Sequence, residues 1–159
     1  MVLLNNLSNL VKRNNTLITK VFSGEITLSS AGVLDHECQL CISELVSRLE
    51  GIVTAYHECD LHQVTKGINA ALSDLNAFFH HRAPWLVHKG QAEKKAKQTC
   101  LVVSNFVREL VWLLTPITPE LCQRITAELG HLPSTFLSKS EFTLQDIKAK
   151  SANSHWKRV

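Results

Sequence analysis

Three side chains in this sequence are of types that could bind nucleotides. Asn9 and Arg13 are four residues apart, so on a helix they share one face and can converge on one ligand. The amide offers both donors and acceptors, and the guanidinium offers a fork of donors for base edges or phosphate. Trp85 follows Ala83-Pro84, and an exposed tryptophan at a helix end is a stacking platform for a base. The chemistry that these residues indicate is recognition, not catalysis.

The same residues also admit plainer interpretations. An Asn/Arg pair on a polar helix face is usually solvated surface, and a tryptophan after proline often covers a hydrophobic core. Lysines could add contacts to phosphates, although scattered lysines normally form a solvated face. The candidates for phosphate contacts are Lys12, Lys20, Lys94, Lys95 and Lys97.

A second group of residues has a spacing close to that of a zinc ribbon. Cys38, Cys41, Cys59 and His62 read C-x2-C-x17-C-x2-H. If the chain from Leu40 to His57 is helical, Cys41 and Cys59 are about 27 Å apart at ~1.5 Å per residue, too far for one zinc ion. Cys38 and Cys41 also lie on an apolar stripe. We therefore expect core thiols and no metal site.

The remaining histidines and cysteines do not indicate an enzyme. His80-His81 and His57/His62 have no carboxylate or thiol partner at useful spacing, so they are expected on the surface. Nor can a nucleophile–base pair be assembled, because no third orienting residue is identified.

The elements that must position these residues are helices, because apolar residues recur at helical spacing almost throughout. Asp60 is a plausible N-cap, Pro84 ends the third helix, Thr118-Pro119 places an N-cap before a first-turn proline, and Gly130 stops the fifth helix. The expected helices cover residues 3–22, 33–57, 61 to about 82, 91–114 and 119 to about 129, with a loop over 23–32. At most one weak helix is expected after Pro133, over 144–150.

This pattern predicts an all-α fold, an antiparallel bundle of about five helices with a less regular C-terminal tail. We assign residues 1–133 to the bundle and 134–159 to the tail. The tail, which ends in Trp156-Lys157-Arg158-Val159, could dock on a catalytic domain outside this chain.

Composition sets limits on the class of protein. The chain has 159 residues, a net charge of +3, eight histidines and five cysteines. That charge is compatible with a polyanionic partner. No apolar run approaches the ~20 residues that cross a bilayer, and the start lacks the features of a secretory signal. The start passes directly into a helix pattern, so we expect the chain to begin inside a longer protein. An odd number of cysteines favours a reducing compartment.

Three strings in a fixed order resemble a known family. Asn9-Leu10-Val11-Lys12-Arg13-Asn14 reads N-L-x-x-R-N, Ala83-Pro84-Trp85 reads A-P-W, and residues 113–120 read L-L-x-P-x-x-P-E. Over residues 5 to 130 this order is similar to the anticodon-binding bundle of class I aminoacyl-tRNA synthetases, and most similar to the methionyl enzymes. An anticodon is a single-stranded loop with splayed bases, the kind of RNA that proteins read by sequence.

The resemblance implies roles for individual residues. Asn9 and Arg13 would recognise anticodon bases, and Trp85 would stack on one of them. Ser8 stands where the family usually has glycine. The implied partners are the anticodon loop of tRNA(Met) and the catalytic domain of the parent synthetase, with no membrane and no DNA. The parent would use ATP and magnesium, and this chain would hold no cofactor.

The catalytic signatures of the family are not expected to operate here. Residues 137–140 superficially resemble the K-M-S-K-S loop, but that loop precedes the bundle in the family. H-I-G-H is absent, and so is a βαβ region that could hold ATP. We therefore expect no enzyme activity from this chain alone, within a parent that is an ATP-dependent methionine–tRNA ligase.

Two alternatives remain at this stage. The chain could be the anticodon-binding domain of another class I synthetase, for instance the valyl or leucyl enzyme. It could also be a helical protein-interaction adaptor, which would present a large exposed apolar groove. The expected compartment is intracellular, either the cytoplasm or the mitochondrial matrix.

Overall fold

The structure, a computed structural model, describes residues 2–87, 91–129, 142 and 144–148. Over these residues the chain forms six helices and one two-stranded sheet. The helices are α1 (Val2–Val21), α2 (Leu28–Ala31), α3 (His36–His57), α4 (Leu61–Arg82), α5 (Gln91–Leu114) and α6 (Pro119–Leu129), and the strands are β1 (Glu25–Ile26) and β2 (Ile147–Lys148). The predicted all-α bundle is confirmed, and the five long helices occur where the apolar periodicity indicates.

Capping residues explain where the helices begin. The Asp60 side chain accepts a hydrogen bond from the Gln63 backbone N–H, so its predicted role as N-cap of α4 is confirmed. α3 begins at His36, later than the predicted Val33, because the Asp35 side chain accepts from the Cys38 N–H and caps the helix there. Pro119 is the first residue of α6, as predicted. The predicted stop at Gly130 lies outside the described residues.

Two predictions about irregular segments are wrong. The expected loop over 23–32 contains β1 and the short α2, which Thr27 and Ser30 hold with a reciprocal capping box. The expected weak helix over 144–150 contains β2 instead. β1 and β2 pair antiparallel, with Glu25 opposite Lys148 and Ile26 opposite Ile147. A two-residue strand is too short to show a period of two, so the sequence pattern carried no signal for either strand.

The described part of the tail therefore packs on the bundle itself. Ile26 and Ile147 are both buried, in a small apolar cluster with Ile18 and Leu101. The domain boundary at residue 133 and a contact of the tail with a catalytic domain remain predictions. Trp156-Lys157-Arg158 and the K-M-S-K-S-like string at 137–140 lie outside the described residues.

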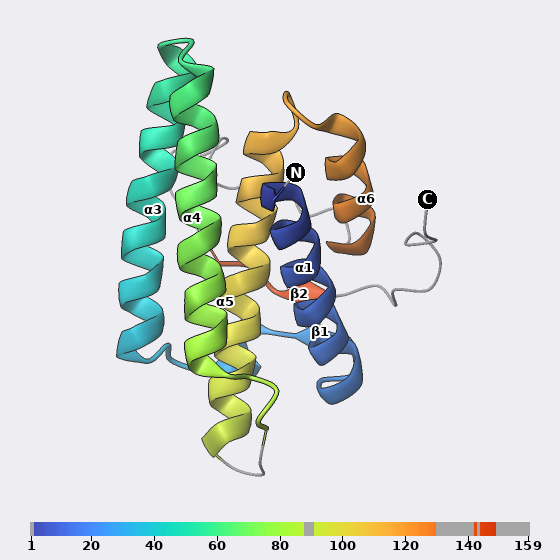
Figure 1. Ribbon diagram of the computed structural model, residues 1–159. Coiled ribbons are helices and arrows are strands. Elements are labelled where there is room, and N and C mark those ends of the chain that lie inside the picture. Colours follow the sequence, from blue (N-terminus) through green and yellow to red (C-terminus); the bar gives the residue numbers. More distant parts are fainter. Residues whose placement is uncertain (1, 88–90, 130–141, 143, 149–159) are drawn as a thin grey trace.

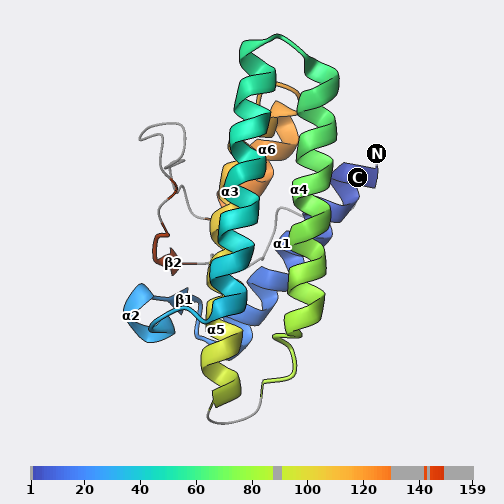
Figure 2. The same cartoon turned by 90° about the vertical axis from the view of Figure 1, so that its left-hand side faces the viewer.

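α5 is the central helix of the bundle. It contacts α1, α3, α4 and α6, and its side chains are buried from Gln98 to Val111. α3 and α4 form a long hairpin whose tip extends beyond α5 and α6 (Figures 1 and 2). These two helices approach closely at Gly67, where an added Cβ would lie 2.7 Å from Cγ1 of Ile52. The main core gathers Phe79 and Phe106 with aliphatic side chains from α1, α3, α4 and α6.

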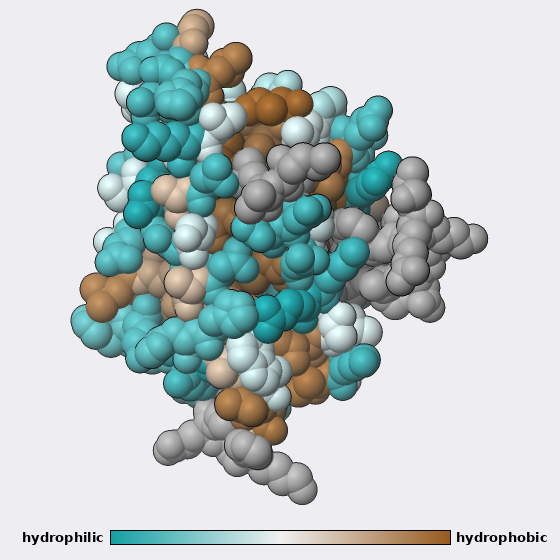
Figure 3. Space-filling model, in the orientation of Figure 1, coloured by the Kyte–Doolittle hydropathy of each residue, from teal (hydrophilic) through white to brown (hydrophobic). Residues whose placement is uncertain are grey.

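The surface carries no broad apolar face in the view of Figure 3, where apolar spots are separated by hydrophilic side chains. The exposed large apolar residues are spread over several elements: Val21, Leu28, Val33, Leu40, Leu61, Trp85, Leu86, Trp112 and Ile117. In the described part of the chain, no helix is long and apolar enough to cross a membrane.

Candidate nucleic-acid interface

A hollow of about 300 Å³ lies between the middle of α1 and the C-terminal end of α4. It brings two of the three predicted site residues together. Its lining residues are Lys12, Arg13, Thr16 and Leu17 from α1, Phe79 from α4, and Trp85 from the segment that follows α4. The hollow thus combines cationic groups with aromatic surface, the combination that binds bases and phosphates of single-stranded RNA.

The guanidinium of Arg13 lies over two aromatic rings. Its Cζ is 5.0 Å from the ring centroid of Trp85 and 5.3 Å from that of Phe79, which are cation–π distances. Phe79 is fully buried, and its ring centroid is 5.7 Å from that of Trp85. Trp85 itself is 41% exposed, so part of the indole remains open to a ligand. The Phe79 ring therefore contacts both the Arg13 guanidinium and the Trp85 indole.

His80 completes this cluster from the exposed side. Its Nε2 lies 3.2 Å from Nη1 of Arg13, and because arginine can only donate, the imidazole nitrogen accepts. The imidazole ring is also edge-on to Trp85, with 5.7 Å between centroids and 73° between planes. His80 thus contacts two of the three residues predicted to bind RNA, Arg13 and Trp85.

The turn after α4 explains why Trp85 folds back on Phe79. Ala83 caps the helix in the left-handed region, with φ 45° and ψ 59°, and its N–H donates to the Phe79 carbonyl. For a residue with a Cβ this conformation costs about 1–2 kcal/mol, so the surroundings must hold it. The Leu86 N–H then donates to the Ala83 carbonyl across Pro84-Trp85. This turn therefore places the Trp85 indole back against Phe79 of α4.

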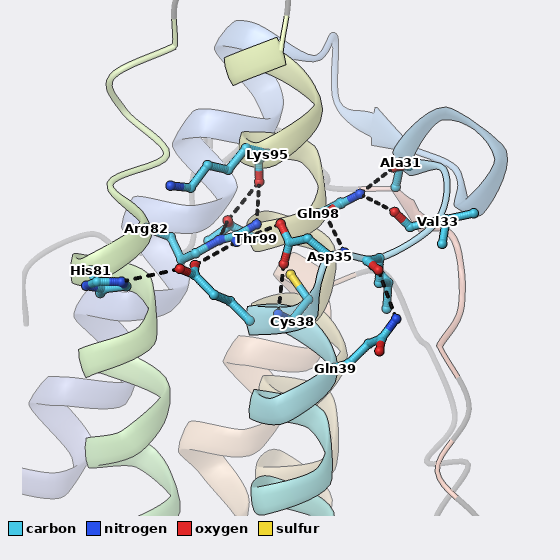
Figure 4. A network of polar contacts seen from close by, with 12 residues as sticks. Ala31, Val33, Asp35, Cys38, Gln39, His81, Arg82, Lys95, Gln98 and Thr99 are labelled. Carbon is cyan, nitrogen blue, oxygen red and sulfur yellow. Dashed lines mark hydrogen bonds and ion pairs between the residues drawn. The ribbon is translucent and has the colours of Figure 1, made fainter.

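Arg82 anchors the end of α4 on the side facing α3 and α5 (Figure 4). Its side chain is only 1% exposed, and its Nη1 lies 2.7 Å from Oδ2 of Asp35 and 2.9 Å from Oε2 of Glu37. Its Nε donates to the Thr99 hydroxyl, and its Nη2 donates to the Lys95 carbonyl. One buried guanidinium therefore ties the end of α4 to the start of α3 and to the first turns of α5. We call this set of contacts the Arg82 network.

The Arg82 network lowers the pKa values of its two carboxyl groups. The hydrogen bond from Arg82 lowers the pKa of Glu37 below its usual value. For Asp35, partial burial acts to raise the pKa, but the hydrogen bonds from the Cys38 N–H and from Arg82 outweigh it and lower the pKa. Both groups are therefore carboxylates at neutral pH, and the network contains one cation with two anions.

Asn9 is exposed on α1, one turn before Arg13 and on the same face, but it does not line the hollow. A ligand would have to extend along α1 to touch both. Of the predicted phosphate contacts, Lys12 lines the hollow. Lys20 is exposed in the last turn of α1.

The three lysines of α5 lie in other surroundings. The end of the Lys94 side chain lies against Gly32, where an added Cβ would be 2.8 Å from Cε of Lys94. Lys95 is exposed, and its carbonyl belongs to the Arg82 network. Nζ of Lys97 lies 3.3 Å from Oε1 of Glu93 and over the ring of Phe22. Their role as phosphate contacts remains a prediction.

Sequence reasoning overlooked two residues of this site. It expected His80 on the surface, where the structure places it, and it did not single out the buried Phe79. It did not connect either residue with Arg13. The available signal was an aromatic residue and a histidine in the last turn before Ala83-Pro84-Trp85.

Three of the cysteines are buried, Cys41 is partly buried and Cys59 is exposed. Burial raises the pKa of Cys38 and of Cys41 to about 12, so neither is a reactive thiolate at neutral pH. Cys59 follows the C-terminal end of α3, whereas Cys38 lies in its first turn. Over the residues that the structure describes, no three His, Cys, Asp or Glu side chains form a group that could hold a metal ion.

Comparison with known proteins supports the resemblance seen in the sequence. A family model described as the anticodon binding domain of methionyl tRNA ligase matches residues 29–154, which is most of the chain. The match includes Trp85 and begins after α1. Methionine–tRNA ligases of Psychrobacter sp. (strain PRwf-1) and of Leptospira biflexa serovar Patoc are similar, at 28% identity over 137 residues and 29% over 140 residues.

These relatives are much longer than this chain. The aligned parts cover 86% and 87% of this chain but only 19% and 20% of the relatives, so the chain spans about a fifth of their length. Among solved structures, the free form of Mycobacterium tuberculosis methionyl-tRNA synthetase superposes with a TM-score of 0.80 over 98% of this chain and 32% of that one. The form bound to methionyl-adenylate gives the same score. At 21% identity these two likenesses establish the fold.

The family match decides between the interpretations that the sequence left open. It names neither another class I synthetase nor an adaptor, and it extends over Trp85 and over the residues of the Arg82 network. The chain belongs to the family of anticodon-binding domains of methionyl-tRNA ligase.

Proposed function

We propose that this chain reads the CAU anticodon of tRNA(Met) for a parent methionine–tRNA ligase. The observation that carries the proposal is the convergence of Arg13 and Trp85 on one hollow, with the guanidinium 5.0 Å from the indole ring centroid. An aromatic face that is partly exposed and a cation beside it suit a splayed base and its phosphate.

Within this proposal each residue has a distinct role. Trp85 stacks on a base, Arg13 donates hydrogen bonds to a base edge or phosphate, and Asn9 reads a neighbouring nucleotide one helical turn away. Lys12 adds electrostatic attraction at the hollow, and Lys20, Lys94, Lys95 and Lys97 add it further away. Phosphate contacts give affinity, whereas base contacts give the choice of anticodon.

The proposal places the chemistry in another part of the parent protein. ATP and magnesium would bind a catalytic domain outside this chain, and anticodon docking would make productive aminoacylation depend on the correct tRNA. The expected compartment, cytoplasm or mitochondrial matrix, belongs to this proposal too. Support comes from the family match and from the ligase names of the relatives.

The test is a binding titration at one low salt concentration against two anticodon stem–loops that differ only in the anticodon, CAU or GAU. We expect the whole chain to bind the CAU stem–loop more tightly, because base contacts discriminate while phosphate contacts are shared. Equal affinity for both would leave only a general electrostatic surface and would contradict the proposal. Absence of binding would contradict it for the isolated chain.

A further inference from the structure

The side chain of Arg13 is long and exposed, and three neighbouring side chains contact its guanidinium. Its guanidinium lies over Phe79 and Trp85 and donates to Nε2 of His80. A free arginine loses considerable rotamer entropy when a ligand fixes it. Groups that fix it beforehand reduce that loss at the moment of binding.

The contact with His80 depends on the protonation state of the imidazole. Nε2 accepts a hydrogen bond only when the ring is neutral and its proton is on Nδ1. A protonated ring has no acceptor and carries a positive charge beside the guanidinium. The neutral ring can therefore accept a hydrogen bond from Arg13, and a protonated ring cannot.

Among the described residues, His80 forms no ion pair with a carboxylate. From α1, Arg13 contacts the imidazole and Lys12 lines the same hollow. On α4 the neighbouring His81 and Arg82 both face Glu37. The segment after α4 contributes Trp85, which is uncharged. Protonation would thus place a second cation beside the Arg13 guanidinium.

We propose that His80 is a positioning residue for anticodon recognition, which holds the Arg13 guanidinium against Trp85 before RNA arrives. The inference rests on the proposed function and deepens it. His80 need not touch RNA, because it acts through the donor group and the stacking surface that do.

Two substitutions at position 80 separate the aromatic ring of His80 from its hydrogen-bond acceptor. His80→Phe keeps an aromatic ring beside Trp85 but removes the acceptor. His80→Gln supplies an amide oxygen as acceptor and cannot titrate. His62→Gln, at the opposite end of α4 and exposed, is the matched control.

The first measurement uses the free protein, so it does not depend on RNA. Nitrogen-15 relaxation of the Arg13 Nε–Hε group, assigned by its loss in Arg13→Lys, reports how rigid the guanidinium is. We expect a rigid group in the wild type and in His80→Gln, and a mobile one in His80→Phe. Equal rigidity in all three would overturn the inference while leaving the proposed function untouched.

The second measurement is affinity for the CAU stem–loop between pH 8 and pH 5.5, expressed as the ratio of wild type to His80→Gln. Charge gained by the other histidines cancels in this ratio. At pH 8 we expect a ratio near one, with His80→Phe about threefold to tenfold weaker, the range for one net hydrogen bond. Towards pH 5.5 the wild type should weaken relative to His80→Gln, while His62→Gln follows the wild type.

Other results would overturn the inference in identifiable ways. A wild type that tightens relative to His80→Gln at low pH would mean that the imidazolium attracts phosphate directly. A mobile Arg13 in His80→Phe with unchanged affinity would mean that positioning does not matter for binding. If the wild type did not distinguish CAU from GAU, the proposed function would fail, and this inference would fall with it even if His80 orders Arg13.

Discussion

Arg13 and Arg82 lie beside the same end of α4 and are held in opposite ways. Arg82 is buried, and two carboxylates, a hydroxyl and a carbonyl take up its donors. Arg13 is exposed and rests on aromatic rings, with a neutral imidazole as acceptor. One arginine has its charge neutralised inside the protein, and the other does not.

The difference indicates what each arginine is for. A guanidinium with its charge and donors satisfied can fix the backbone but has little left to offer a ligand. A guanidinium held by rings and a neutral acceptor is positioned, yet keeps its charge for an anion. The buried arginine thus sets the place of the turn that carries Trp85, and the exposed one shares the hollow with that residue.

The largest expected effect is on stability, from Arg82→Met. The substitution removes the central donor of the Arg82 network and leaves two carboxylates facing each other. We expect the free energy of unfolding to fall by roughly 2–3 kcal/mol, because both carboxylates are partly exposed and can regain water. Urea denaturation measures it. Arg48→Met, which breaks an exposed pair with Asp74, should cost less than about 1 kcal/mol. Equal losses would contradict the comparison.

Next in size is the effect of Trp85→Ala on RNA affinity. Removing the stacking surface should weaken binding to the CAU stem–loop by about 1–3 kcal/mol and leave the fold intact, because the side chain is 41% exposed. A titration with a circular dichroism check measures both. Trp112→Ala changes a tryptophan of similar exposure near the end of α5; it is the control and should bind normally. Unchanged affinity in Trp85→Ala would remove Trp85 from the site.

A smaller effect is expected from Arg13→Lys, which keeps the charge but loses the planar fork of donors. Affinity for the CAU stem–loop should fall about threefold to tenfold, with the preference over GAU reduced. The slope of log affinity against log salt should stay the same, because the number of charges is unchanged. A changed slope with an unchanged preference would make Arg13 a phosphate contact only. Arg124→Lys on α6 is the control.

The smallest effect is a pH dependence of stability from Glu37. Its pKa in the folded state lies below the ordinary value of 4.5, so its contribution is present above that value. It is lost as the pH falls through the lower, folded-state pKa. Glu37→Gln should therefore be slightly less stable than the wild type at pH 7, with the difference closing as the pH falls below 4.5. Thermal unfolding from pH 7 to pH 3 measures this, with Glu50→Gln on α3 as control. A gap that widens in acid would contradict the assigned role.

Local patterns in the sequence were enough for the long helices. The apolar period, Asp60 as N-cap, and the prolines at 84 and 119 place α4, α5 and α6 almost to the residue. These signals work because capping and proline geometry depend on neighbours within one turn. The family resemblance, in turn, drew attention to Asn9, Arg13 and Trp85 as a set.

The site and the small sheet depend on contacts between distant segments. Arg13 and His80 are 67 positions apart in the chain, and neither residue type predicts a contact with the other. Asp35 and Glu37 showed no sign of sharing Arg82, and Ile26 gave no sign of pairing with Ile147. The sequence by itself determined the five long helices and the kind of side chains available for RNA. Only the tertiary structure decided which arginine is neutralised and which faces solvent, because that depends on the groups that packing brings around each one.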